Sequence, residues 1–190
     1  MIKERVVKAY EFSKEKHGSQ VRKFSGLPYF SHPKEVARIV EDLTKDEDLI
    51  IVALLHDTIE DTNTTYDEIK KLFGKKIADF VVELTSDDKR SIRKFGKGLY
   101  LGMKMSEMTQ EALVVKLADR FHNVKYLEGD DVPFKFIKKY YHETWVILGI
   151  VKRSDHLNEF RRLGNVIDLL IERIEIILKF LEVRYDFDKE

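Results

Sequence analysis

The sequence predicts an all-α fold, with residues 1–190 forming a single domain built as a helical bundle. Only 3 prolines and 9 glycines interrupt the 190 residues, which leaves room for long helices. Apolar residues recur at spacings of three and four along much of the chain, whereas no segment alternates apolar and polar residues as a half-buried strand does. With 43% hydrophobic and 36% charged residues, the chain has enough apolar content to bury a core.

The N-terminal half contains the clearest helical patterns. Apolar residues at helical spacing predict a helix over 36–43, and Pro33 suits its first turn, where the missing N–H costs nothing. Residues 49–59 are apolar nearly all round, which predicts a helix buried in the core. A Thr-x-x-Glu capping box opens a helix over 65–73, a glycine ends it, and helical spacing resumes over 77–84.

The C-terminal half contains three further predicted helices. Residues 86–98 are polar and fit no element clearly. Thr109 caps a helix that runs to about residue 126, and Pro133 opens another that runs to about residue 149. An apolar stripe over 167–181 predicts a long last helix with one buried face.

Composition excludes several classes of function. The 34 basic and 34 acidic residues balance, whereas a nucleic-acid-binding protein normally has a basic surplus. Cysteine is absent, so any metal must be bound by His, Asp or Glu. Charges interrupt the N-terminus, which argues against a signal peptide, and the longest apolar run, 49–55, is far too short to span a membrane. We expect a cytoplasmic protein that binds neither nucleic acid nor membrane; the composition gives no indication of its oligomeric state.

The segment HDTIED, residues 56–61, places ionisable side chains at the end of the predicted buried helix. On a continuous helix Glu60 lies about 40° from His56. Asp61 lies equally close to Asp57. His56 and Asp57 can then offer an imidazole nitrogen and a carboxylate oxygen to one cation, while the two acidic residues one turn further on are suited to handle a water. The alternative is a solvated helix end, but acidic groups are disfavoured near a helix C-terminus.

Three other segments contain polar residues with two possible interpretations. Asp119, in KLADRFHN, follows an apolar run and is either a partly buried ion-pair partner or a metal ligand, with Asn123 one turn below it. His32, in PYFSHP, is either a helix-capping residue or a ligand. Arg22 and Lys23, in HGSQVRKFSG, are either phosphate contacts or an ordinary solvated basic pair.

Taken together, these segments supply a set of hard nitrogen and oxygen ligands: His32, His56, Asp57 and Asp119. Because sulfur is absent, manganese, iron, magnesium and zinc are all chemically plausible. Manganese suits mixed imidazole and carboxylate coordination well.

The order His, His-Asp, Asp on predicted helices resembles the HD superfamily of metal-dependent phosphohydrolases. The segments HGSQVRKFSGLPYFSHPKEVARIV, ALLHDTIEDT, KKLFGKKIADFVVELTSDDK and VKLADRFHNVKYL look like the (p)ppGpp hydrolase domain of the RelA/SpoT family, over roughly residues 17–128. The SDDK stretch, residues 86–89, is closer to the stand-alone small alarmone hydrolases, a group that includes the metazoan SpoT homologue.

This resemblance implies an HD-type helical bundle that uses one Mn²⁺ to hydrolyse the 3′-pyrophosphate of guanosine tetra- or pentaphosphate, giving GDP or GTP and pyrophosphate. The implied metal ligands are His32, His56, Asp57 and Asp119. The implied catalytic pair is Glu60 and Asp61, with no division of work between them. The implied contacts to the nucleotide substrate are Arg22, Lys23, Asn123 and Tyr126.

Two departures from the family pattern lie near the expected nucleotide. Phe24 is an extra residue before Gly26, and Tyr126 stands where many members have threonine. These changes keep two alternatives open: hydrolysis of another phosphorylated nucleotide such as NADPH, or a non-catalytic nucleotide-binding regulator.

Overall fold

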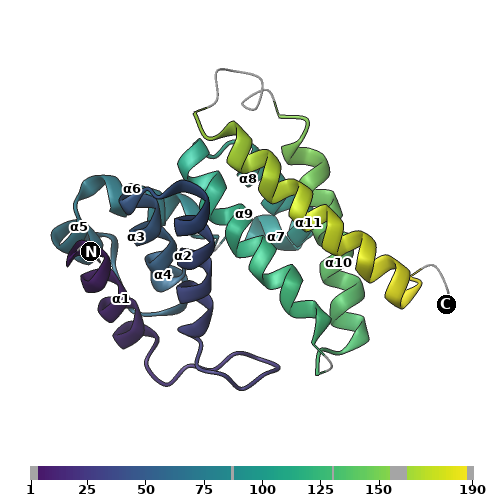
Figure 1. Ribbon diagram of the computed structural model, residues 1–190, viewed down its shortest axis with the longest axis horizontal. Coiled ribbons are helices and arrows are strands. Elements are labelled where there is room, and N and C mark those ends of the chain that lie inside the picture. Colours follow the sequence, from purple (N-terminus) through teal and green to yellow (C-terminus); the bar gives the residue numbers. More distant parts are fainter. Residues whose placement is uncertain (1–3, 87, 130, 155–161, 188–190) are drawn as a thin grey trace. The chain divides into compact units, whose positions relative to one another are not determined.

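The computed structural model describes residues 4–86, 88–129, 131–154 and 162–187 (Figure 1). Within these ranges the chain forms α-helices, one short 3-10 helix and an isolated bridge between Val21 and Pro28, with no strand of a sheet. The predicted all-α fold is therefore confirmed. The chain divides into two compact units, Met1–Asp87 and Asp88–Glu190, which are described separately below. A single domain over 1–190 stays a prediction.

The first unit consists of helices around a central buried segment (Figure 1). Their bounds are α1 Glu4–His17, α2 Ser31–Thr44, α3 Glu47–Leu55, α4 Thr58–Asp61, α5 Tyr66–Phe73 and α6 Lys75–Leu84. Helix α3 packs against α1, α2 and α6, and its residues from Leu49 to Leu55 are all buried. The predicted threonine cap is present, since the Thr65 hydroxyl accepts a bond from the Glu68 amide at 3.2 Å.

The prediction of one continuous helix over 49–59 was wrong in one respect: the helix is interrupted at His56 and Asp57. Two side chains take carbonyls that a continuous helix would pair with backbone amides. His56 Nδ1 bonds to the Ala53 carbonyl at 2.8 Å, and the Thr58 hydroxyl donates to the Leu55 carbonyl at 2.7 Å. The chain then resumes as the short helix α4, whose Asp61 amide still bonds to the Asp57 carbonyl. Acidic residues 60 and 61 therefore remain about one turn beyond residues 56 and 57.

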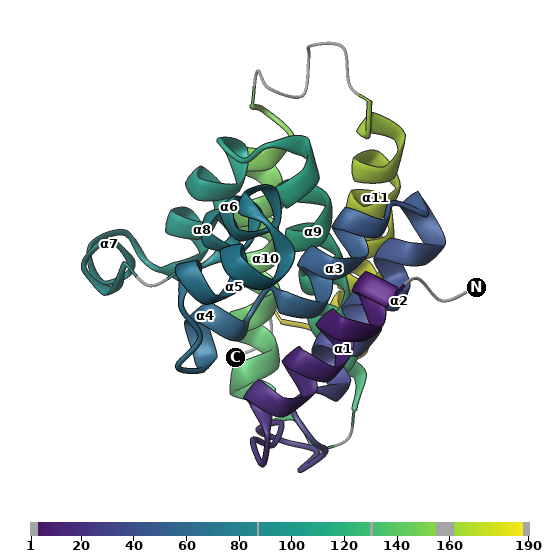
Figure 2. The same cartoon turned by 90° about the vertical axis from the view of Figure 1, so that its left-hand side faces the viewer.

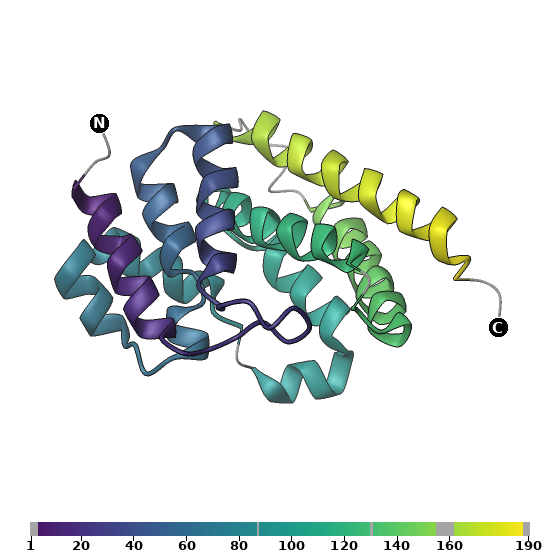
Figure 3. The same ribbon diagram turned by 60° about the horizontal axis from the view of Figure 1, so that its bottom comes forward.

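A long loop joins α1 to α2 and extends beyond the ends of both helices (Figure 3). At its base, the Tyr29 amide donates to the Gln20 carbonyl at 2.8 Å. The Arg22 amide donates to the Leu27 carbonyl at 2.8 Å, and Gly26 closes the tip with a φ of +65°, a conformation that glycine adopts without strain. Backbone hydrogen bonds and one isolated bridge therefore hold the two arms of the loop together, so the loop is not an open coil.

The second unit contains the C-terminal helices (Figure 2). Their bounds are α7 Lys89–Phe95, α8 Lys97–Ser106, α9 Gln110–Lys125, the 3-10 helix Tyr126–Glu128, α10 Phe134–Val151 and α11 Gly164–Tyr185. Helix α8 packs against α10, and α11 runs along α9. The helices α9, α10 and α11 confirm the prediction. Helices α7 and α8 were not predicted, and neither was α1 of the first unit. The start of α7 is marked by Asp88, whose carboxylate accepts bonds from the Arg90 and Ser91 amides.

None of the helices in the described ranges combines the length and the apolar character needed to cross a bilayer.

Two glycines of the second unit should respond to alanine in opposite directions. At Gly102, where α8 meets α10, a Cβ atom would lie 2.6 Å from Ile150 Cδ1 and 3.3 Å from Ile147 Cα, whereas nothing lies within 4 Å of that position at Gly149. Gly149→Ala should raise the free energy of unfolding by about 0.5–1 kcal/mol through helix propensity. Gly102→Ala should lower it by about 1 kcal/mol, because overpacking outweighs the same gain. Urea denaturation of both variants measures the difference; an equal rise would show that the α8–α10 contact is looser than described.

Candidate metal centre and neighbouring carboxylates

His56 ends α3 with a ring that is 1% exposed. Its Nδ1 lies 2.8 Å from the Ala53 carbonyl oxygen. A carbonyl can only accept, so Nδ1 carries the proton and Nε2 of the neutral ring carries a lone pair. That Nε2 faces Asp57 Oδ2 at 3.1 Å, which is also an acceptor when the carboxylate is ionised. Two acceptors at this distance are satisfied by a proton or a cation held between them.

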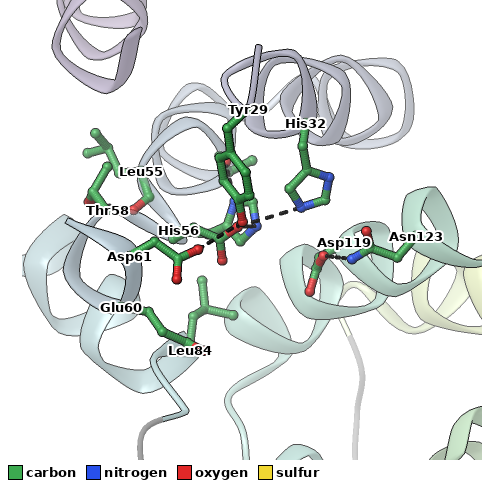
Figure 4. Close-up of polar contacts among 12 residues, drawn as sticks. Tyr29, His32, Leu55, His56, Thr58, Glu60, Asp61, Leu84, Asp119 and Asn123 are labelled. Carbon is green, nitrogen blue, oxygen red and sulfur yellow. Dashed lines mark hydrogen bonds and ion pairs between the residues drawn. The ribbon is translucent and has the colours of Figure 1, made fainter. Parts of the chain in front are cut away.

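His32 adds a second imidazole to the same carboxylate oxygen. It lies in the first turn of α2, is 3% exposed, and places Nε2 3.6 Å from Asp57 Oδ2. The ring centroids of His32 and His56 are 5.2 Å apart (Figure 4). Two donors bound about 2.1 Å from one ion lie roughly 3.0–3.4 Å apart, depending on the coordination geometry. The spacing of these three side chains therefore fits the ligand shell of a divalent metal ion with small adjustments.

Tyr29 joins this cluster to a second carboxylate. Its hydroxyl oxygen lies 2.8 Å from Asp57 Oδ2 and 2.9 Å from Asp61 Oδ2 (Figure 4). Burial raises the pKa of the Tyr29 phenol far above its ordinary value, and the charges of Asp57 and Asp61 raise it further. The phenol therefore keeps its proton and acts as a donor between the two carboxylates.

The two acidic residues of α4 are exposed and are oriented by different groups. The Gln20 side-chain amide donates to the Asp61 carbonyl at 2.7 Å, and Gln20 Oε1 in turn lies 2.9 Å from His17 Nδ1. Glu60 Oε2 accepts a bond from the Ser86 backbone amide at 2.9 Å. The Asp61 carboxylate is thus linked to Asp57, whereas the Glu60 carboxylate is held at the end of α6.

In the second unit, α9 carries the remaining predicted ligand and one predicted substrate contact. Asp119 is 8% exposed and accepts a bond from the Asn123 side-chain amide at 2.5 Å. Its other oxygen lies 3.4 Å from Lys116 Nζ, so the ion-pair alternative drawn from the sequence is realised in the structure. A charge-paired carboxylate can also be a metal ligand, so the pair leaves that role open to experiment. Tyr126 follows directly as the C-cap of α9 and is half-buried.

Arg22 and Lys23 lie on the α1–α2 loop, Arg22 half-buried and Lys23 exposed. The ammonium of Lys23 lies 5.3 Å from the centroid of the Phe24 ring, so the extra residue of this loop contacts the basic pair directly. The loop returns to the carboxylate cluster through Tyr29. A contact of either basic side chain with a nucleotide stays a prediction.

The sequence analysis missed Tyr29 and Gln20, both of which touch Asp61. Tyr29 stands three residues before His32 in the PYFSHP segment, but neither periodicity nor ligand chemistry distinguishes it from a core aromatic residue. Gln20 is one polar residue in a polar loop. Only the fold of the loop brings the two side chains to α4.

Comparison with known proteins finds similarities for the first part of the chain. Residues 9–98 match the family model described as HD domain. The chain is 43% identical over 125 residues to the guanosine-3′,5′-bis(diphosphate) 3′-pyrophosphohydrolase of Aquifex aeolicus, a match that covers 65% of this chain and 18% of that protein. It is 47% identical over 124 residues to the GTP pyrophosphokinase rsh of Brucella ovis, covering 63% and 16% respectively. The chain spans less than a fifth of the length of these curated relatives.

A solved structure has the same helical fold over most of the chain. It is that of a metazoan orthologue of SpoT, described as hydrolysing ppGpp, with a TM-score of 0.73 and 23% sequence identity. The match covers 91% of this chain and 97% of that one. The match to the HD domain model, together with the cluster of His32, His56 and Asp57, indicates a site for a divalent metal ion.

Proposed function

We propose that this chain, which carries an HD domain homologous to that of the RelA/SpoT (p)ppGpp hydrolases, removes the 3′-pyrophosphate of guanosine tetra- or pentaphosphate by hydrolysis. The products are GDP or GTP and pyrophosphate. The observation that carries the proposal is the convergence of His32, His56 and Asp57 beside a carboxylate, Asp61, that shares a phenol with Asp57. The partner of this protein is then a small nucleotide, and we expect the protein to act in the cytoplasm.

The proposed ligands of one Mn²⁺ are His32, His56, Asp57 and Asp119. Imidazole and carboxylate donors without sulfur suit this ion, and a cation between them would satisfy the paired acceptors of His56 and Asp57. A bound divalent ion would supply positive charge that offsets the phosphate oxygens and lowers the pKa of water. Asn123 and Lys116 hold the Asp119 carboxylate from two sides and so fix its orientation.

The proposed roles of Glu60 and Asp61 follow from their exposure and their anchors. Both carboxylates are open to water, and neither is an acceptor partner of the two imidazoles in the described contacts. A carboxylate in this position can orient the attacking water and take its proton as the bond to phosphorus forms. As the bond between phosphorus and the 3′ oxygen breaks, the carboxylic acid formed by that proton transfer can return the proton to the 3′ oxygen. The products are pyrophosphate and a nucleotide with a free 3′-hydroxyl.

The proposed nucleotide contacts are Arg22, Lys23, Asn123 and Tyr126. A guanidinium stacks on a purine face, whereas an ammonium makes a point contact with a phosphate. Arg22→Ala and Lys23→Ala should each raise KM about tenfold, the effect of losing one charge-assisted bond of about 1.5 kcal/mol. Initial-rate kinetics measure the change in KM and should give kcat within about threefold of the parent.

Two basic residues outside the loop provide matched controls for these variants. Arg38 and Lys45 are exposed on and after α2, and Arg38 pairs with Glu35 and Asp42 on its own helix. Arg38→Ala and Lys45→Ala should leave KM unchanged. Equal effects of all four substitutions would indicate long-range charge rather than contact, and would remove Arg22 and Lys23 from the site.

The experiment that tests the function is an assay of the purified chain with ppGpp and Mn²⁺, with identification of the leaving group. Release of pyrophosphate with formation of GDP supports the proposal. A panel that includes NADPH and other 3′- or 2′-phosphorylated nucleotides tests the alternative substrates, because the bulk of Tyr126 and Phe24 is compatible with a base other than guanine.

Tyr126→Thr should change the order of kcat/KM among these nucleotides if Tyr126 lies against the base. Binding of ppGpp without turnover would instead indicate a regulator.

A further inference from the structure

We infer that Tyr29 is a positioning residue, which holds the Asp61 carboxylate at a fixed place relative to Asp57; the inference rests on the proposed function. Its phenol oxygen is within hydrogen-bond distance of one oxygen from each carboxylate, at 2.8 Å from Asp57 and 2.9 Å from Asp61. Neither the resemblance nor the residue patterns of the sequence assign a role to Tyr29. Tyr29 would therefore influence the reaction through the Asp61 carboxylate rather than by contact with the substrate.

Tyr29 can serve as a reference point because it is itself fixed on every side. Its amide donates to the Gln20 carbonyl at 2.8 Å, and its carbonyl accepts from the His32 amide at 2.8 Å. Its ring packs against the ring of His17, with centroids 4.9 Å apart. It also lies edge-on to the His32 ring, with centroids 6.0 Å apart (Figure 4). The phenol oxygen therefore has little freedom to follow a displaced carboxylate.

The phenol has one proton for two carboxylate oxygens. Both carboxylates lie within reach of that proton and compete for it. If a cation were bound by Asp57 and the two imidazoles, it would reduce the demand of Asp57 for the proton, which would then be available to Asp61. One oxygen of Asp61 becomes fixed by Tyr29, and the other is left to face water.

The backbone of Asp61 is fixed independently of its carboxylate. The Gln20 amide donates to the Asp61 carbonyl at 2.7 Å, and the Asp61 amide donates to the Asp57 carbonyl at 2.8 Å. Loss of the Tyr29 hydroxyl should therefore release the side chain of Asp61 without displacing α4. This separates positioning of the carboxylate from the folding of the segment.

A double-mutant cycle tests the inference. Tyr29→Phe should lower kcat about 10- to 100-fold, as loss of an outer contact to a reacting group typically does, with KM within about threefold. In the Asp61→Asn background the same substitution should change kcat less than about threefold, because the reacting carboxylate that Tyr29 positions is already absent. Calorimetric titration with Mn²⁺ alone should give an affinity within about fivefold of the parent. An undiminished effect in the Asp61→Asn background, or a fall in Mn²⁺ affinity that matches the fall in kcat, would overturn the inference.

Tyr66→Phe is the matched control, since Tyr66 makes the same kind of bond, hydroxyl to the Asp79 carboxylate at 2.9 Å, on the surface of the same unit. It should leave kcat, KM and Mn²⁺ affinity unchanged. Crystal structures of the parent and Tyr29→Phe proteins with Mn²⁺ give a readout that needs no substrate: the Asp61 carboxylate should move by more than about 1 Å while Asp57 stays. An unmoved Asp61 rejects the inference, whereas a parent protein that releases no pyrophosphate from ppGpp rejects only the proposed function.

Discussion

Asp57→Asn is expected to abolish binding of Mn²⁺ and to lower turnover of ppGpp by about 10³-fold or more. The Asp57 carboxylate faces both imidazoles, at 3.1 Å from His56 and 3.6 Å from His32. Loss of the ion removes several kcal/mol of charge stabilisation, and each 1.4 kcal/mol is a factor of ten in rate. The substitution also changes the local hydrogen bonding, because an asparagine amide can donate to His56 Nε2 where the carboxylate cannot.

Stability and metal binding together identify this variant. The protein without metal should be about as stable as the parent, since asparagine has the size of aspartate and keeps one acceptor oxygen. Added Mn²⁺ should raise the thermal midpoint of the parent but not that of Asp57→Asn. Calorimetric titration and thermal unfolding with and without Mn²⁺ measure both effects. Asp42→Asn, an exposed aspartate on α2, is the control that should retain the shift. Parental Mn²⁺ affinity in Asp57→Asn would exclude Asp57 as a ligand.

Glu60→Gln and Asp61→Asn are each expected to lower kcat about 10²- to 10⁴-fold while the protein keeps its metal. This is the usual effect of losing a general base. Glutamine at 60 can still accept the bond from the Ser86 amide, and asparagine at 61 can still accept from Tyr29, so both variants should fold as the parent does. Steady-state kinetics and metal analysis of the same preparations separate the two readouts.

The chain offers a matched pair for this experiment. Glu41 and Asp42 are also adjacent acidic residues, and both are exposed on α2. Glu41→Gln and Asp42→Asn should leave kcat unchanged. Loss of metal in Glu60→Gln or Asp61→Asn would show that the substituted residue is a metal ligand. Full activity of the double variant Glu60→Gln, Asp61→Asn would show that another group acts as the base.

The sequence predicted most of the helices because the residues that start a helix and the spacing of its apolar residues are local features of the chain. The threonines before α5 and α9 mark helix starts because each side chain accepts a bond from a backbone amide within one turn. The proline before α10 marks a start through its fixed φ rather than through a side-chain bond. The short helix α7 escaped because its apolar residues are few and none of its residues is buried. Its cap residue, Asp88, was the available signal.

The site was predictable in its residue types but not in its connections. A histidine and an aspartate at the end of an otherwise apolar buried helix are polar residues where burial favours apolar ones, and this local inconsistency predicts a functional role for residues 56 and 57. The break between α3 and α4 was not predicted, because it depends on side chains of His56 and Thr58 taking carbonyls one turn back. The bond from Tyr29 to Asp61 spans 32 positions in the sequence, and no local pattern reports a contact of that range.

The α1–α2 loop is fastened to one residue at both of its ends. Gln20, near its start, bonds to the carbonyl of Asp61, and Tyr29, at its finish, bonds to the carboxylate of the same residue. A bridge between Val21 and Pro28 then separates this base from the tip that carries Arg22, Lys23 and Phe24. The tip can therefore gain or lose residues without disturbing Asp61. In evolutionary terms the tip of the loop is an exchangeable part, whose residues can change while the two bonds that hold Asp61 are kept.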